Sequence, residues 1–308
     1  MTQKPIAGLL DAMGTQALPC IHNEPLDRHT TFRIGGPAAV FCKPRTVAEL
    51  TRTLELCREN QVRTYLLGNG SNTLFADEGF DGAVICLTDL KTRSTCEVLP
   101  DGSVRLTAGA GTMLVSVCNQ ALEHSLTGLE FAYGIPGTVG GAVYMNAGAY
   151  GGEMKDVLEQ VTFLDEDLKL HTLPAEELEL GYRTSIFERQ SWCILEAQFL
   201  LHPGDRDQIN AQMQDYMSRR RDKQPLELPS AGSTFKRPAG CFAGQLIEEC
   251  GLRGFSVGGA AVSQKHCGFV VNVGGATCAD VVELTDRVRA IVQEKTGHIL
   301  EREIRVVR

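Results

Sequence analysis

Arg183 is one residue of this 308-residue chain whose type and setting favour chemistry. It stands between Tyr182 and Ser185 in the polar segment GYRTSIFE, which separates two apolar stretches. A guanidinium in such a place can form a bidentate pair with a carboxylate or a phosphate. A surface salt bridge is the plainer explanation when the segment is considered alone.

Ser233 lies among cations in the segment KQPLELPSAGSTFKRP (223–238), which also contains Lys223, Lys236 and Arg237. The GxSxG pattern of a nucleophile elbow is missing, so we do not expect a hydrolase serine. A serine near positive charge can instead give up a proton, because that charge favours the alkoxide. An ordinary turn serine remains the default interpretation.

Two acids, Glu301 and Glu303, stand in the alternating C-terminal segment 300–307. If this segment is a strand, the alternation places both carboxyl groups on one face. Charges that keep an edge strand from pairing would explain the same pattern.

Two glycine-rich segments favour binding of a large anionic ligand. In LLGNGSNTLFAD (66–77) a predicted strand opens into a loop that is neither a Walker loop nor a GxGxxG turn. Backbone N–H groups freed by glycine can form an anion-binding nest, which a pyrophosphate fits. An ordinary glycine turn is the open alternative. The loop residues are Gly68, Asn69, Gly70, Ser71 and Asn72.

The second glycine-rich segment, 128–154, carries eight glycines in 27 residues. A hydrophobic core does not require this density, so we expect the backbone to lie flat against something large and planar or polyanionic. A dinucleotide cofactor meets that description. The sequence Ile135-Pro136-Gly137 predicts a rigid turn within it, and a run of tight turns without a ligand is the alternative.

Local patterns around these segments predict a mixture of helices and strands. Thr46 and Thr112 are plausible N-caps, and Gly251 and Gly297 end two of the helices. The basic residues 219–221 are expected to form a solvated helix end. Predicted helices span 46–60, 112–126, 206–224, 242–252 and 279–297, and predicted strands span 62–68, 82–87, 103–110, 157–165, 168–173, 192–201 and 300–307.

The composition excludes several classes of protein. A formal net charge of -8 gives no basic footprint for nucleic acid. Unbroken apolar stretches are too short to span a membrane, and Asp11 interrupts the N-terminal apolar region that a signal peptide would need. The eleven cysteines show no CxxC and no zinc spacing, so we expect buried thiols in a reducing cytoplasm and no metal.

Six motifs in order resemble the UDP-N-acetylenolpyruvoylglucosamine reductase (MurB) family, from about Thr30 to Arg305. The chain has no tyrosine-bearing insertion between YRTS and SAGS, which resembles the shorter, second subtype. The motifs are TTFRIGGPA (30–38), LGNGSN (67–72), GIPGTVGGAVYMNAGAYGGE (134–153), YRTS (182–185), KQPLELPSAGSTFKRP (223–238) and EREIR (301–305).

The resemblance implies an α+β fold, with a two-lobed FAD-binding domain of the vanillyl-alcohol-oxidase type and a smaller α+β substrate domain. The implied boundaries are 1–89 for the first FAD-binding lobe, 90–205 for the second, 206–300 for the substrate domain and 301–308 for a strand that returns to the FAD domain.

The resemblance also implies an activity. It is the NADPH-dependent reduction of UDP-N-acetylglucosamine enolpyruvate to UDP-N-acetylmuramate through non-covalent FAD, in peptidoglycan synthesis. Arg183 and Glu303 would stabilise the enolic intermediate, and Ser233 would protonate carbon 2. The implied partner is a UDP-sugar substrate, with no nucleic acid and no membrane, for a cytoplasmic monomer or weak homo-oligomer.

Further residues carry over by motif. The implied substrate-binding residues are Tyr182, Lys223, Lys236 and Arg237. The implied cofactor-binding residues are Arg33, Gly68, Asn69, Gly70, Ser71, Asn72, Gly134, Ile135, Pro136, Gly137, Thr138, Gly140, Gly141, Asn146 and Gly148.

The chain departs from many relatives at two positions. Arg237 replaces an asparagine, which puts a substrate hydrogen bond in doubt. Arg302 replaces a proline, and we expect this to change only the backbone stiffness beside Glu303.

Two other functions compete with this hypothesis. One is an FAD enzyme of the same fold that oxidises an alcohol or sugar, often with a histidine bonded to the flavin. His124 and His171 have no motif for such a bond. The other is an inactive FAD-binding or interaction protein, which the presence of all three catalytic positions argues against.

Overall fold

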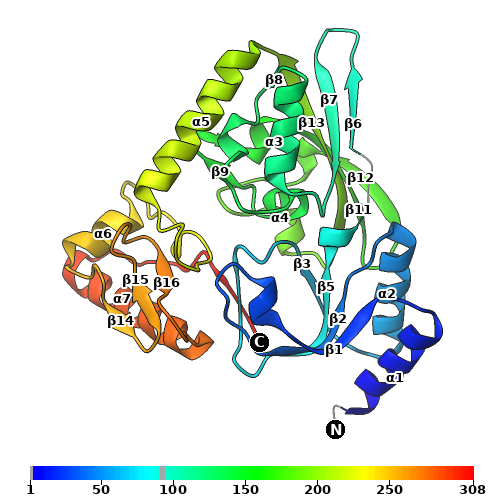
Figure 1. The fold of residues 1–308 in the computed structure, drawn as a ribbon, viewed down its shortest axis with the longest axis horizontal. Coiled ribbons are helices and arrows are strands. Elements are labelled where there is room, and N and C mark those ends of the chain that lie inside the picture. Colours follow the sequence, from blue (N-terminus) through cyan, green and yellow to red (C-terminus); the bar gives the residue numbers. More distant parts are fainter. Residues whose placement is uncertain (1–2, 91–93) are drawn as a thin grey trace. The chain divides into compact units, whose positions relative to one another are not determined.

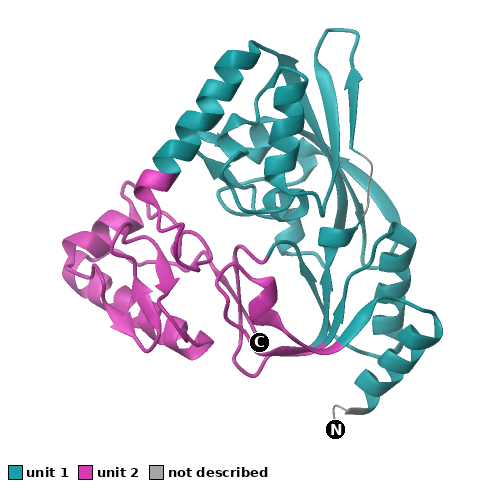
Figure 2. Ribbon diagram, in the orientation of Figure 1, with its two compact units in different colours: residues 1–21, 40–69, 82–220 teal, residues 22–39, 70–81, 221–308 magenta. Residues whose placement is uncertain are grey.

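The computed structural model describes residues 3–90 and 94–308, which form two compact units (Figures 1 and 2). The first unit comprises Met1–Ile21, Val40–Asn69 and Gly82–Arg220. The second comprises His22–Ala39, Gly70–Asp81 and Arg221–Arg308. Each unit is therefore assembled from three separate stretches of chain. The predicted lobe boundaries remain predictions.

The N-terminal part of the chain forms a sheet of four strands in the order β1-β2-β5-β3. Its helices α1 and α2 pack on each other, and their apolar residues share a core with β2 and β5. The elements are α1 (Gln3–Thr15), β1 (Cys20–Pro25), β2 (Pro37–Cys42), α2 (Val47–Glu59), β3 (Thr64–Leu67) and β5 (Phe80–Cys86).

A larger antiparallel sheet completes the first unit, in the order β12-β11-β13-β7-β6, with β8 paired to β13. Helices α3 and α4 pack on this sheet and share its largest core cluster (Figure 1). The strands are β6 (Thr95–Val98), β7 (Val104–Gly109), β8 (Leu126–Thr127), β11 (Leu158–Leu164), β12 (Leu170–Pro174) and β13 (Cys193–Pro203), and the helices are α3 (Leu114–Glu123) and α4 (Val139–Tyr144).

The glycine-rich segment after α4 folds into a short hairpin of β9 (Gly148–Ala149) and β10 (Gly152–Glu153). Helix α5 (Arg206–Lys223) follows β13 and ends in the second unit.

The second unit contains helices α6 (Ala243–Glu249) and α7 (Cys278–Thr296) and a sheet of β14 (Ser256–Val257), β15 (Ala260–Val262) and β16 (Val270–Asn272). Strand β17 (Arg305–Val307) pairs in parallel with β4 (Thr73–Phe75). The apolar residues of these elements form one cluster that also includes Phe32 and Ile34. The unit therefore has its own core, drawn from all three of its stretches.

Local signals place most helices and strands where the sequence predicts them. Thr46 caps α2 by accepting from the backbone N–H of Glu49 at 3.1 Å. Thr277 and Asp280 form a capping box at the start of α7, and Gly297 ends that helix with a φ of 75°.

The predicted N-cap of α3 is wrong. Helix α3 begins after Met113, not Thr112. The reason is a long-range contact: the carbonyl of Thr112 accepts from the backbone N–H of Val139 at 2.8 Å, while its own N–H bonds to Gly109. These bonds hold Thr112 in a turn before the helix.

The predicted strand over 300–307 is also wrong in its first half. Only Arg305–Val307 forms a strand, and Arg302 makes an isolated bridge with Phe235. The expectation that Glu301 and Glu303 lie on one face of a strand therefore loses its basis.

The cysteines are free thiols in this structure, most of them buried. Burial raises the pKa of Cys193 to about 12, and chiefly burial raises that of Cys118 to about 12. Within the described residues, no three His, Cys, Asp or Glu side chains gather as a metal site would require. None of the described helices is both long enough and apolar enough to cross a bilayer.

Asp77 provides a test of how the second unit is held together. Its carboxylate accepts from the backbone N–H groups of Cys278 (2.6 Å) and Ala279 (3.0 Å) at the N-terminus of α7. We predict that Asp77→Ala lowers the free energy of unfolding by about 1 kcal/mol, because a helix N-terminus loses an anionic cap. Urea denaturation measures this change. The neighbouring exposed Glu78→Ala is the control, and an equal loss in both variants would contradict the cap.

Candidate active site

Ser233 and Glu303 are brought together within the second unit by antiparallel pairing of two short segments. The backbone N–H of Glu303 donates to the carbonyl of Thr234 at 2.9 Å. Two residues along, the N–H of Lys236 donates to the carbonyl of Glu301 at 2.8 Å. Residues 233–236 therefore run beside 301–304, although the two segments lie far apart in sequence.

Thr234 anchors this pairing through buried hydrogen bonds. It is buried, with 1% of its surface exposed. Its N–H donates to the carbonyl of Gly268 (2.8 Å), and its hydroxyl accepts from the N–H of Val270 (2.8 Å). Ser233, directly before it, is exposed. The arrangement presents the Ser233 hydroxyl from a rigid backbone.

Asn72 joins the same group. Its side-chain amide donates to the backbone carbonyl of Glu303 at 3.2 Å, and its own backbone carbonyl accepts from the N–H of Arg305 at 3.0 Å. A predicted cofactor residue thus lies beside a predicted catalytic residue. Gly70, from the same loop, has its Cα packed so closely on the carbonyl of His29 that an added Cβ would lie 2.2 Å from that oxygen.

The replacement of proline by Arg302 does more than change the backbone stiffness beside Glu303, which corrects the expectation from sequence. Its guanidinium donates to the hydroxyl of Thr285 (2.7 Å) and the carbonyl of Val282 (3.1 Å), and it pairs with Asp286 (2.5 Å). These contacts attach the Glu303 segment to α7. Although burial opposes it, hydrogen bonding from Arg302 holds the pKa of Asp286 below its usual value.

The predicted substrate cations of the second unit have different settings. Lys236 forms an ion pair with Glu301 at 2.6 Å, which partly neutralises its charge. The guanidinium of Arg237 lies 4.6 Å from the ring centre of Phe242, as in a cation–π contact. Lys223 is exposed at the end of α5.

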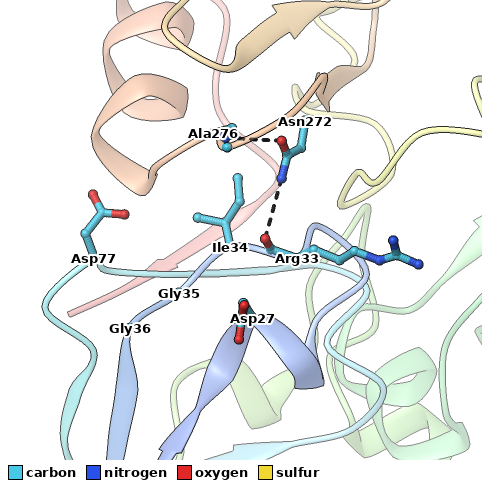
Figure 3. Close-up of a pocket in the computed structure, with 9 residues that line it drawn as sticks. Asp27, Arg33, Ile34, Gly35, Gly36, Asp77, Asn272 and Ala276 are labelled. Carbon is cyan, nitrogen blue, oxygen red and sulfur yellow. Dashed lines mark hydrogen bonds between the residues drawn. The ribbon is translucent and has the colours of Figure 1, made fainter.

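Arg33 lines a pocket of about 310 Å³ in the second unit (Figure 3). The amide of Asn272 joins two walls of this pocket by accepting from the N–H of Ala276 (3.2 Å) and donating to the carbonyl of Arg33 (3.5 Å). The Arg33 guanidinium points away from the carboxylates of Asp27 and Asp77. The pocket contains none of the three predicted catalytic residues.

In the first unit the two glycine-rich segments meet. The side-chain amide of Asn69 donates to the carbonyl of Pro136 at 2.7 Å. A Cβ added to Gly68 would lie 2.5 Å from the hydroxyl oxygen of Thr138, and one added to Gly140 would lie 2.9 Å from the Cβ of Ala110. Only glycine permits these approaches.

These loops fit a large polar cofactor. Thr138 is buried and its hydroxyl accepts from the N–H of Gly141 at 3.4 Å, whereas Pro136 and Gly141 themselves stay exposed. Pro136 and Gly141 are small, and a dinucleotide can approach backbone of this kind closely. The neighbours Ile135 and Gly137 are tied inward, Ile135 by apolar packing and Gly137 through its carbonyl, which accepts from the N–H of Leu114 (3.0 Å).

Arg183 belongs to the first unit and stands in a two-residue turn between Gly181 and Thr184. Its φ of 56° is in the left-handed region, which is uncommon for a residue with a side chain. Its guanidinium donates to the carbonyl of Gly148 at 2.9 Å and lies 5.2 Å from the ring centre of Tyr182.

The setting of Arg220 differs from the expectation from sequence. It was expected at a solvated helix end, but it is partly buried against the Cα of Gly134, where an added Cβ would lie 2.9 Å from its Cδ. Burial lowers the pKa of its guanidinium. The tyrosines 150 and 216 stack beside this region, with ring centres 4.4 Å apart. The i, i+4 spacing of Tyr216 and Arg220 on α5 was the available signal.

The ion pair between Arg302 and Asp286 predicts a pH-dependent stability. The pKa of Asp286 is depressed in the fold, so the pair contributes above about pH 4 and is lost as the carboxylate protonates below it. We predict that Arg302→Met costs about 1 kcal/mol at neutral pH, since Asp286 is half exposed, and less at pH 3. Urea denaturation at both pH values measures this. Arg287→Met, which breaks the exposed ion pair of Arg287 with Glu283, is the control. If the stability cost of Arg302→Met does not shrink in acid, the account is contradicted.

Comparison with known proteins identifies both parts of the chain. Residues 37–173 match the family model "FAD binding domain". Residues 224–307 match "UDP-N-acetylenolpyruvoylglucosamine reductase, C-terminal domain". An FAD-binding domain followed by a C-terminal α+β domain confirms the predicted fold class and the predicted cofactor.

Two relatives that match almost the full chain carry the same name. UDP-N-acetylenolpyruvoylglucosamine reductase of Lachnoclostridium phytofermentans is 46% identical over 299 residues, which is 97% of this chain and 96% of that protein. The enzyme of the same name from Caldanaerobacter subterraneus subsp. tengcongensis is 46% identical over 285 residues, 92% of each chain.

A solved structure agrees with these relatives. The crystal structure of UDP-N-acetylenolpyruvylglucosamine reductase (MurB) from Thermus caldophilus matches with a TM-score of 0.78 and 35% identity, over 94% of this chain and 99% of that one. The resemblance inferred from the six motifs is confirmed. By identity, coverage and fold, the chain belongs to the UDP-N-acetylenolpyruvoylglucosamine reductase (MurB) family.

Proposed function

We propose that this chain reduces UDP-N-acetylglucosamine enolpyruvate to UDP-N-acetylmuramate with NADPH and FAD, in peptidoglycan synthesis. The observation that carries the proposal is the antiparallel pairing of residues 233–236 with 301–304. It places side by side the two segments that carry Ser233 and Glu303, the residues to which the family's motifs assign a proton donor and a stabilising acid. Family membership supports the substrate, the cofactor and the hydride donor.

Bound FAD would supply the hydride chemistry that links NADPH to carbon 3 of the enolpyruvyl group. The other steps depend on residues of the chain. Negative charge then develops on carbon 2 and spreads into the substrate carboxylate. Arg183 stabilises that charge as a cation. Glu303, in its protonated form, stabilises it as a hydrogen-bond donor.

Ser233 completes the reaction by giving its proton to carbon 2. A serine hydroxyl is a weak acid, so its conjugate base needs positive charge nearby. Lys236 already shares its charge with Glu301, which leaves Lys223 as the exposed lysine available for this purpose or for the substrate diphosphate. Reduction therefore adds one hydride and one proton, to adjacent carbons.

Within the first unit, Gly68, Asn69 and residues 134–141 form the close backbone surface that we assign to the cofactor. Gly70, Ser71 and Asn72 belong to the second unit, and their cofactor role rests on the motif alone. We further propose that the protein works in the cytoplasm as a monomer or weak homo-oligomer, with no nucleic-acid partner.

Replacing the proton donor tests the proposal. We predict that Ser233→Ala slows formation of UDP-N-acetylmuramate by about 10²-fold or more, because general acid catalysis of carbon protonation is lost. Mass spectrometry of the product, which is heavier than the substrate by two hydrogens, measures the rate. Ser256→Ala, an exposed serine on β14, is the control. Equal rates in the two variants would remove Ser233 from the mechanism.

The state of the flavin separates this function from its competitors. We predict that acid denaturation with trichloroacetic acid releases FAD into the supernatant, because no residue of the chain is proposed to bond to it. Absorbance of the supernatant and of the redissolved pellet measures the partition. Flavin that remains in the pellet would favour a covalent oxidase, and a colourless purified protein would count against both enzymes.

A further inference from the structure

The turn that carries Arg183 is held in an unusual backbone conformation. Gly181 and Thr184 close it by exchanging backbone hydrogen bonds, at 3.1 Å from the N–H of Gly181 and 3.4 Å from that of Thr184. Arg183 adopts a φ of 56°, a conformation that residues with side chains adopt rarely unless their surroundings require it. The surroundings of this turn therefore decide where the guanidinium points.

Asn146 is the main anchor of that turn. Its side-chain amide group donates to the carbonyl of Gly181 at 2.9 Å and to the carboxylate of Glu153 at 2.8 Å. Its side-chain oxygen accepts from the backbone N–H of Lys155 at 2.9 Å. Asn146 is completely buried. Both of its amide hydrogens and its oxygen are thus engaged by the protein, so its side chain serves the fold of this site.

Two more contacts tie the same pieces of chain. Arg183 itself donates to the carbonyl of Gly148, two residues beyond Asn146. The hydroxyl of Ser185, which is 1% exposed, donates to the carbonyl of Tyr144 at 2.7 Å. The Arg183 turn is therefore bonded at three points to residues 144–148, which include the predicted cofactor residues Asn146 and Gly148.

We propose that Asn146 is a positioning residue for Arg183: it holds the turn so that the guanidinium is presented in one orientation to the developing charge. The inference rests on the proposed function, because that function gives Arg183 its task. Misplacing a charged group by about 1 Å can cost about 10²-fold in rate, so the anchor matters for catalysis as well as for folding.

A double-mutant cycle tests the inference. Asn146→Gly removes the amide without straining the backbone, since the φ of 40° at this position suits glycine. Each variant is loaded with FAD, reduced anaerobically with NADPH, and mixed with UDP-N-acetylglucosamine enolpyruvate. The rate of flavin reoxidation is measured for the wild type, Asn146→Gly, Arg183→Ala and the double variant.

We expect Asn146→Gly to slow reoxidation by about 10-fold or more when Arg183 is present. In the Arg183→Ala background it should change the rate less than about twofold, because the group that it positions is gone. The same factor in both backgrounds would overturn the inference and leave Asn146 a general structural residue.

Two further variants keep the test decisive. Asn146→Asp keeps the shape and the acceptor oxygen but loses both donors, so it takes the place of Asn146→Gly if that variant does not fold. Glu130→Gln disturbs another buried polar group of the first unit, which accepts hydrogen bonds from Thr127 (2.6 Å) and Gly128 (2.8 Å), both outside the Arg183 turn. It should show no coupling to Arg183, and coupling as strong as that of Asn146 would overturn the inference.

Failure of the proposed function gives a different result. If the enolpyruvyl sugar does not reoxidise the reduced wild-type protein, or if Arg183→Ala reacts at the wild-type rate, the proposed function fails and the inference fails with it. Equal effects of Asn146→Gly in both backgrounds overturn the inference alone.

Discussion

The close approach of two backbone loops is the constraint on which the cofactor-binding unit depends. Gly68 and Thr138 come so near that any side chain on the glycine would collide with the threonine hydroxyl. The bond from Asn69 to the carbonyl of Pro136 holds the loops in that position. Glycine atoms are small, so a dinucleotide could approach backbone of this kind closely, as we propose for FAD. A close backbone approach of this kind is one reason for glycine that a packed core does not supply.

The second unit solves a different problem, which is to hold two distant segments side by side, each carrying a residue that we propose to be catalytic. It does so with backbone hydrogen bonds between Thr234 and Glu303 and with a buried threonine beneath Ser233. Arg302 then attaches the Glu303 segment to α7. The reactive side chains come from irregular segments, but regular elements and buried contacts fix them, which is how catalytic geometry is usually maintained.

Local signals made much of this predictable. The N-cap of α2, the glycine that ends α7, the glycine loops and the order of the motifs are read within a few residues of chain. What the sequence did not predict depends on partners far away. Thr112 fails as a cap because Val139 occupies its carbonyl. The first half of the tail makes only an isolated bridge, between Arg302 and the distant Phe235, so it forms no strand of its own. The burial of Arg220 and the anchoring of Arg183 by Asn146 arise in the same way, from contacts that periodicity does not encode.

The central claim is that one flavin takes hydride from NADPH and gives it to the enolpyruvyl sugar. Anaerobic stopped-flow absorbance of the wild-type protein tests it most directly. NADPH should bleach the oxidised-flavin band at roughly 450 nm, which is a property of the cofactor itself. UDP-N-acetylglucosamine enolpyruvate should then restore this band rapidly. Bleaching without recovery would contradict the claim, because the protein would accept hydride but pass it to some other substrate.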